Sequence, residues 1–280
     1  MPGFLSPTRP SAVTRWFGCA AVALVASLAA VVTSTPAVAR ASAPQLVRAA
    51  AHGVSKPDKL RDPSANRSAA PDYLDFCAVN GPRNPTCVKR ALKAINNAHA
   101  AEGIRKMILP SDYAQLTTAE QTFVITDLER VARGLRPFVG LTARLNQNAH
   151  HAAVVRDDPT LLGAILSLLG VREYGSIWAG DFGPLASDFD WMYNDGYSSD
   201  GSVNLDCTRP GQSGCWGHRH VILGLYSGLP HLLAGGGTAK PAGASIAEVL
   251  CGTVGHVPAL TYSWKDALAF GANGHKVTAA

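Results

Sequence analysis

The chain has 280 residues, of which 47% are hydrophobic and 16% are charged, and its formal net charge is +5 at pH 7. The basic residues form no dense run, so this small charge does not indicate binding to nucleic acid. The length is sufficient for one domain with a sizeable hydrophobic core.

Residues 1–39 are predicted to be a cleavable signal peptide. Arg9 and Arg15 precede an apolar stretch from Trp16 to Val32, and Ala37-Val38-Ala39 provides the small residues that signal peptidase selects. The 17 residues of the apolar stretch are at the short end of the ~17–25 that span a bilayer. Cleavage would remove two arginines and no acid, lowering the net charge from +5 to +3. We therefore expect a secreted, extracellular protein without a membrane span after cleavage.

The composition divides the rest of the chain into three segments. Residues 40–71 are rich in Ala, Ser and Pro and contain few large apolar side chains, which is typical of a disordered linker. Residues 72–270 have the composition of a folded domain, and residues 271–280 are expected to form a flexible tail.

The first half of this domain is predicted to be helical. Helical spacing of apolar residues gives one buried face in each of three segments: Val88, Leu92 and Ile95; Val124, Leu128, Val131 and Leu135; and Leu141, Leu145, Ala149 and Ala152 or Ala153. The first helix begins at Pro85 and ends near Gly103, and Thr118 and Gln121 have the spacing of a capping box for the second. The third ends at Asp157-Asp158-Pro159, and a short apolar helix follows between Thr160 and Leu169.

The second half of the domain is predicted to contain long loops and then strands. Gly, Asp, Asn, Ser and Pro dominate from Gly180 to Gly217, as in functional or pinned loops. Short strands are expected at His231–Ala234, Ser245–Cys251 and Ala259–Ser263. Helices followed by strands favour the α+β class, here an α-β-α sandwich with a small antiparallel sheet.

The cysteines predict two small disulfide loops. Cys77 and Cys87, and likewise Cys207 and Cys215, are close in sequence and separated by turn residues, so that each pair can close in an oxidising compartment. Cys251 is then left over, and we expect it to be a buried thiol inside a strand. None of the spacings is Cys-x-x-Cys, so a structural zinc site is not indicated.

Several stretches in order resemble the CAP superfamily, the cysteine-rich secretory protein (SCP-like) fold. They are Leu128–Phe138, Leu145–Ala149, Trp191-Met192 and Gly217–Leu223, the last with the sequence Gly-His-Arg-His-Val-Ile-Leu. The segments Trp191–Gly196 and Cys215–Arg219 also look like a group of secreted actinobacterial proteins. The resemblance covers about residues 117–265 and implies the α-β-α sandwich of that family.

The same resemblance implies that most of the family's metal-binding residues are missing. His218 matches one of the two cleft histidines, whereas Ala152 stands at the position of the other, with His150 and His151 turned away around the helix. The family's Gly-Glu-Asn-Ile segment corresponds to Tyr174-Gly175-Ser176-Ile177, so that acid is absent, with Glu173 only nearby. Asn194 stands at the position of the other acid, with Asp195 next to it. One ligand of four does not hold zinc, so we expect no metal and no cofactor.

A cleft near His218 is the predicted site. Its expected walls are Trp191, Trp178, Asn194, Trp216 and Arg219, although His218 and Arg219 also suit a structural role. The favoured function is that of a monomeric secreted protein that binds a lipid, a glycan or another cell-envelope component without catalysis. Two alternatives stay open. One is a hydrolase that uses Ser176 and His218 with Asp195 or Glu173, although Ser176 lacks a nucleophile elbow. The other is a purely structural envelope protein.

Overall fold

The fold is described from a computed structural model, in which the described residues are 60–67, 73–180, 183–199, 204, 206–239 and 245–275. The predicted signal peptide, residues 40–59 and 68–71 of the predicted linker, and residues 276–280 of the predicted tail lie outside the described residues.

The described residues form helices and a small sheet, which confirms the α+β class. The helices are α1 (Leu74–Asn80), α2 (Pro85–Ala101), α3 (Thr118–Ala132), α4 (Ala143–Val155), α5 (Gly163–Leu169), α6 (Pro184–Tyr193), α7 (Gly217–Ile222), α8 (Trp264–Ala269) and the 3₁₀ turn η2 (Ala272–Gly274). The strands are β1 (Gly140–Thr142), β2 (Val171–Ala179), β3 (His231–Ala239), β4 (Ser245–Thr253) and β5 (Leu260–Ser263).

The strands form one sheet in the order β2-β4-β3-β1-β5. The pairs β2–β4, β4–β3 and β1–β5 are antiparallel, as expected, whereas β1 and β3 run parallel, so the sheet is mixed. The parallel pair is possible because the chain between β1 and β3 is long and includes helices, as a crossover connection requires. Strands β1 and β2 were not predicted from the sequence; they lie among the helices of the first half and just after it.

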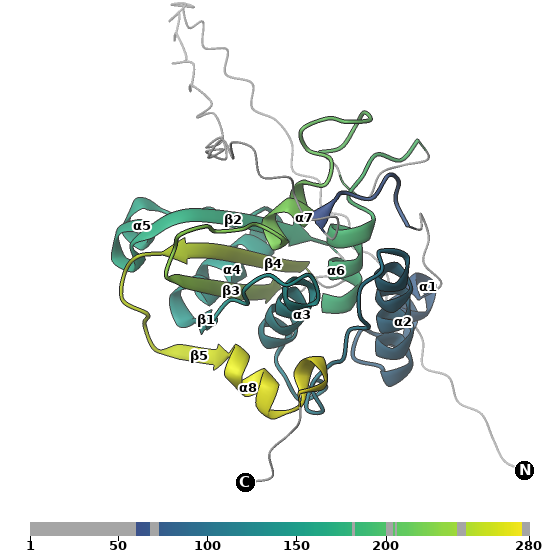
Figure 1. Cartoon of the computed structure of the whole chain (residues 1–280), viewed down its shortest axis with the longest axis horizontal. Helices are drawn as coiled ribbons and strands as arrows, with labels where there is room; N and C mark the ends of the chain where they lie inside the picture. The colour runs from purple at the N-terminus through teal and green to yellow at the C-terminus, as the bar shows by residue number, and fades with distance from the viewer. Residues whose placement is uncertain are drawn as a thin grey trace, which may run out of the picture. The chain divides into compact units, whose positions relative to one another are not determined.

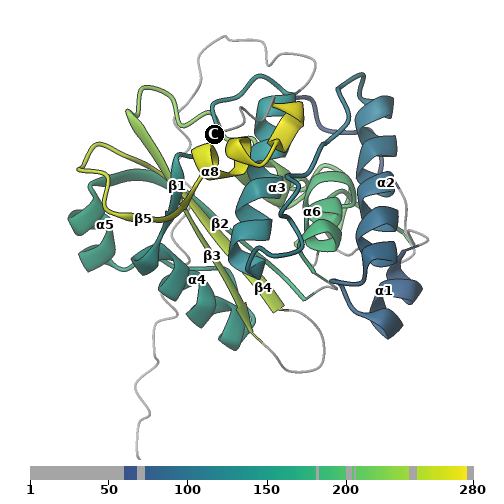
Figure 2. The same ribbon diagram turned by 90° about the horizontal axis from the view of Figure 1, so that it is seen from below.

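Helices cover both faces of this sheet, in the helix-sheet-helix layering expected from the sequence. Helices α4 and α5 lie on one face, and α3, α6 and α7 lie on the other, as Figures 1 and 2 show. Helix α2 packs against the outer side of α6. The core is correspondingly divided into a large cluster on the α3 side and a smaller one on the α4 side.

Glycines in β3 allow α4 to lie very close to the sheet. A Cβ atom on Gly237 would lie 2.1 Å from the backbone nitrogen of His150, and one on Gly235 would lie 2.3 Å from the carbonyl carbon of Leu145. No side chain fits at such distances, so this face of β3 has to be formed by glycine wherever α4 crosses it. The inward-facing alanines predicted for α4, Ala149 and Ala153, are buried at the same interface.

The second long helix, α3, begins one residue earlier than the capping box predicted at Thr118 and Gln121. Thr117 is the N-cap, and its side chain and that of Glu120 satisfy each other's backbone amides. Gln121 is buried and donates instead to the carbonyl oxygen of Tyr113 at 2.7 Å. The sequence contains two overlapping capping-box patterns, Thr117-x-x-Glu120 and Thr118-x-x-Gln121. The first one forms, because the side chain of Gln121 is engaged in the interior.

Helix α6 falls inside the region from Gly180 to Gly217 that we predicted to consist of loops. Pro184 occupies its first turn, where a missing amide hydrogen costs nothing, and nearly all of its side chains are buried. The helix was not predicted because its flanks are rich in Gly and Asp, as in loops. It also has no polar face that would give it an amphipathic pattern.

The folded domain is longer at both ends than predicted. Leu60 is buried in the main core, so residues 60–67 pack on the domain and do not belong to a disordered linker. At the other end Ala272 is fully buried, and the amide of Asn273 donates to the carbonyl of Ile108 at 2.9 Å. Residues 271–275 are therefore part of the domain and not of a flexible tail.

Both predicted disulfides are confirmed. Cys77 is bonded to Cys87, Cys207 is bonded to Cys215, and Cys251 is a buried free thiol in β4. Among the described residues no helix is long and apolar enough to cross a membrane.

Candidate functional site

The predicted site histidine forms a close pair with Asp195. His218 stands at the start of α7, and its Nδ1 atom lies 2.7 Å from Oδ1 of Asp195. The backbone amide of His218 donates to Oδ2 of the same carboxylate at 2.8 Å, as that of Arg219 does at 3.3 Å. Since a carboxylate only accepts hydrogen bonds, Nδ1 carries the proton and Nε2 is the nitrogen left for a ligand.

Asn204 holds Asp195 from the other side. Its side-chain amide donates to Oδ1 of Asp195 at 2.7 Å and to the backbone carbonyl of Asp195 at 2.9 Å. The same amide reaches the carbonyl of Gly214 at 2.9 Å, next to the Cys207–Cys215 disulfide. The disulfide loop and the acid are thus joined, and the imidazole of His218 has a fixed orientation.

The charges around His218 favour its protonated form. Burial lowers the pKa of His218, but the hydrogen bond to Asp195 and the negative charges of Asp195, Asp158 and Asp206 raise it more, so that the net shift is upward. The side chain is 18% exposed, whereas that of Asp195 is buried. Asp158 and Asp206 are exposed. The site therefore offers an imidazole whose protonated form is favoured, together with carboxylate oxygens.

Three of the predicted cleft walls lie in the interior. Trp191, Asn194 and Arg219 are buried, so they do not line an open cleft. The indole of Trp191 donates to the carbonyl of Trp178 at 3.2 Å. The guanidinium of Arg219 donates to the carbonyl of Met192 at 2.8 Å and to Glu102 at 3.1 Å, which is the structural role that the sequence also suggested for it.

Ser176 is on the opposite face of β2 from the helix that carries His218. A Cβ atom on Gly175 would lie 2.6 Å from the side chain of Val221 in α7, so Gly175 faces that helix. Successive residues of a strand point to opposite faces, and Ser176 therefore points toward the α4 and α5 side. Trp178 shares that side, where its indole donates to Ser245 at 2.8 Å.

Glu173, the other acid named for a hydrolase, is exposed on β2. Its charge acts on Tyr226, whose pKa burial raises first and the Glu173 carboxylate raises further. Ser176 thus points away from the helix that carries His218, and the arrangement needed for its nucleophilic attack is not formed.

Trp216 is the predicted aromatic residue that stands beside His218. It precedes Gly217 and His218, is partly exposed, and has a φ of 62°, in the left-handed region that side chains rarely adopt. Its amide donates to the carbonyl of Asp195 at 2.8 Å, and its ring lies against Gly196, where an added Cβ would come within 2.5 Å. Strained backbone of this kind concentrates at binding sites.

A buried network of charges lies deeper, between α2, α3 and α6, and was not predicted. Nε2 of His99 lies 3.0 Å from Glu129, the hydroxyl of Tyr193 donates to Glu129 at 2.8 Å, and Arg133 pairs with both Glu129 and Glu102. The spacing of Glu129 and Arg133, four residues apart in a helix, could have suggested a pair. The side chains of His99, Glu129 and Arg133 are fully buried, so we assign them a structural role.

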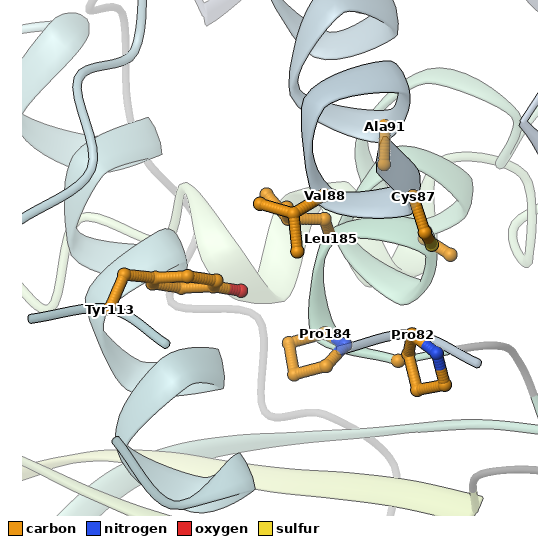
Figure 3. Close-up of a pocket in the computed structure, with 9 residues that line it drawn as sticks. Pro82, Cys87, Val88, Ala91, Tyr113, Pro184 and Leu185 are labelled. Atoms are coloured by element: carbon orange, nitrogen blue, oxygen red, sulfur yellow. The ribbon is translucent and has the colours of Figure 1, made fainter. Parts of the chain in front are cut away.

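A small hollow lies between α2 and α6, and Figure 3 shows the side chains around it. Pro82, Val88, Tyr113, Pro184 and Leu185 are among its lining residues. None of the residues predicted for the His218 cleft contributes to it, and its lining is mostly apolar. We attribute it to imperfect packing beside the Cys77–Cys87 loop.

The histidines predicted to lie near a metal-ligand position of the CAP superfamily do not form a cluster. His150 is exposed on α4, where Nδ1 lies 2.7 Å from the carbonyl oxygen of Thr238, and His151 is also exposed. Within the described ranges, no three side chains of His, Cys, Asp or Glu are grouped as a metal ion requires.

No protein-family model matches the sequence, and no curated protein is significantly similar to it.

Proposed function

We propose that this chain is a secreted, CAP-like protein that binds a glycan of the cell envelope at the His218 site. The predicted signal peptide supports export. Two disulfides are present among the described residues, as is usual for proteins of an oxidising compartment. The layering of helices on a mixed sheet is compatible with the family that the sequence motifs resemble.

The observation that carries the proposal is the fixed, partly exposed imidazole of His218 beside exposed carboxylates. Asp195 and Asn204 set the direction of the ring, and Asp158 and Asp206 place oxygen acceptors near it. Sugar hydroxyls both donate and accept hydrogen bonds, so they can satisfy both kinds of group. Trp216 adds a partly exposed indole, whose flat face suits a sugar ring.

The same geometry favours a glycan over a lipid. Trp191 is buried and the indole of Trp178 bonds to Ser245, so these rings do not form an apolar groove beside His218. It also favours binding over hydrolysis, because Ser176 points away from α7.

Co-sedimentation with purified peptidoglycan, and quenching of tryptophan fluorescence by soluble N-acetylated glycan fragments, test this proposal. We expect saturable binding that His218→Ala weakens about 10- to 100-fold, since a hydrogen bond to a charged group contributes about 1.5–3 kcal/mol. His151→Ala is the matched control, because His151 is an exposed histidine of α4, and its affinity should be unchanged.

Other outcomes would contradict the proposal. Equal binding by the two histidine variants would remove His218 from the site. Binding to phospholipid vesicles but not to glycan would favour a lipid ligand, and binding to neither would favour a structural envelope protein. Turnover of a glycan or ester that Ser176→Ala abolishes would restore the hydrolase alternative.

A further inference from the structure

Residues 60–67, which we call the N-terminal strap, lie against the two segments that carry the His218–Asp195 pair. Leu60 is buried in the main core and anchors the beginning of the strap. From there the strap contacts the end of α6, the turn that follows α6, and α7. These contacts fall on the sequence neighbours of the two site residues.

On the Asp195 side the strap holds the residues before and after the acid. The amide of Arg67 donates to the carbonyl of Tyr193 at 2.9 Å. The side chain of Asn66 makes two hydrogen bonds with the backbone of Gly196: its amide donates to the carbonyl at 3.0 Å, and its oxygen accepts from the nitrogen at 2.8 Å. The backbone around Asp195 is thus fixed at both ends.

Gly196 shows how tightly this contact is built. A Cβ atom there would lie 2.5 Å from the ring of Trp216 and 2.8 Å from the side-chain oxygen of Asn66. The glycine is therefore enclosed between the strap and the residue that begins the His218 segment. Asn66 and Trp216, which stands two residues before His218, therefore both lie close to Gly196.

On the His218 side the strap holds the two residues that follow. The buried guanidinium of Arg219 donates to the carbonyl of Arg61 at 3.2 Å, in a partly buried hydrogen bond. Nε2 of His220 lies 2.7 Å from Asp62, in a pair that is 45% and 36% exposed. Solvent screens the second contact, so we expect it to contribute little.

We infer that the N-terminal strap is a positioning element for the His218–Asp195 pair, with Asn66 as its principal positioning residue. The side-chain amide group of Asn66 is hydrogen-bonded to both polar backbone atoms of Gly196. Without it the turn from Tyr193 to Gly196 can move, and a displacement of about 1 Å is enough to weaken an oriented site. The expected effect of Asn66 on ligand binding rests on the proposed function.

The test is Asn66→Ala in the full-length chain, observed through the Nδ1 proton of His218. A proton held between imidazole and carboxylate gives a separate downfield resonance, which His218→Ala identifies by its disappearance. We expect this resonance to broaden or vanish in Asn66→Ala, and the affinity for peptidoglycan fragments to fall at least tenfold. Asp62→Ala is the matched control within the strap, and both readouts should stay as in the wild type.

Asn66→Asp is the second variant, should the alanine form not fold. It keeps the acceptor for the Gly196 amide and removes the donor, so we expect a weakened but visible resonance. A folded Asn66→Ala protein with a lower melting temperature and an unchanged His218 resonance would overturn the inference, since a merely structural contact gives that result. If the wild type binds no glycan while Asn66→Ala still abolishes the resonance, the proposed function fails and the strap inference stands.

Discussion

The hydroxyl of Thr126 on α3 donates a hydrogen bond of 2.7 Å to the carboxyl group of Glu248 on β4. Both residues are buried, in the layer between helix and sheet. Burial raises the pKa of Glu248 to about 8, against the opposing effects of the Thr126 hydrogen bond and the charge of Arg130. The folded protein therefore keeps a proton on Glu248 at neutral pH, which the unfolded chain releases.

This difference makes stability depend on pH. Because the pKa in the folded state lies above the unfolded value of 4.5, the stabilisation by the bound proton is fully present below pH 4.5 and is lost as the pH rises toward about 8. We expect Glu248→Gln, a neutral amide of the same shape, to be more stable than the wild type at pH 8.5. The gain should be a few kcal/mol, since one pKa unit corresponds to about 1.4 kcal/mol.

Urea unfolding of the two proteins at pH 5 and pH 8.5 measures this effect. Glu173→Gln serves as the control, because Glu173 is an exposed glutamate on the neighbouring strand. A Glu248→Gln protein whose advantage is the same at both pH values would show that Glu248 does not hold a proton in the folded state.

The approach of α4 to the sheet predicts a second, pH-independent effect. In Gly237→Ala the new methyl group would meet backbone atoms of Ala149 and His150, which cannot turn aside as a flexible side chain can. We expect a loss of about 1–3 kcal/mol, as for other overpacked interiors. Gly163→Ala at the start of α5 is the control, because no atom lies within 4 Å of the added Cβ and no loss is expected. Thermal melts of the three proteins would decide, and a Gly237→Ala protein as stable as the control would refute the packing argument.

The sequence predicted those parts of the fold that have a clear period or a local partner. Helix α3 has a regular apolar stripe, and the two disulfides join cysteines that are near in sequence. Strand β2 was missed because Arg172, Glu173 and Ser176 interrupt its apolar pattern, which an edge strand with partly exposed faces tolerates. Helix α6 was missed for the opposite reason, since it is buried on almost every side.

The candidate site shows a similar division. His218 was predicted from the short Gly-His-Arg motif. Asp195 was named because it follows Asn194, which stands where the resembled family has an acid. The burial of Arg219 and the partnership of His99 with Glu129 depend on how α2, α3, α6 and α7 pack together. Residues 30 apart in sequence form that second pair, and no local pattern signals it.

The buried charge network predicts a large cost for breaking one pair. Burial raises the pKa of Glu129, but the charges of Arg133 and His99 lower it by more, so that Glu129 stays ionised in the interior. Arg133→Met removes the nearest positive charge and leaves that carboxylate incompletely paired. We expect a loss of about 3–5 kcal/mol, as for other buried pairs deprived of one partner.

Chemical denaturation at pH 7 measures this loss. Arg144→Met removes an arginine from the exposed face of α4, and we expect it to change the stability by no more than about 0.5 kcal/mol. An Arg133→Met protein that matches this control would mean that the network contributes no net stability.

The last prediction concerns the acid that orients His218. In Asp195→Asn the hydrogen-bonded negative charge is lost while the burial of the ring remains, so the pKa of His218 should fall. The pKa of His218 in the wild type lies above its unfolded value of 6.5, so its contribution to stability is fully present below pH 6.5 and is lost as the pH rises through the folded value. Asp195→Asn should therefore destabilise the protein more at pH 5.5 than at pH 9.

NMR titration of the imidazole of His218 measures the change of its pKa, and urea unfolding at the two pH values measures the change of stability. Asp157→Asn is the control, because Asp157 is exposed. An unchanged His218 titration in Asp195→Asn would show that Asp158 and Asp206, and not the buried acid, set the charge of the ring.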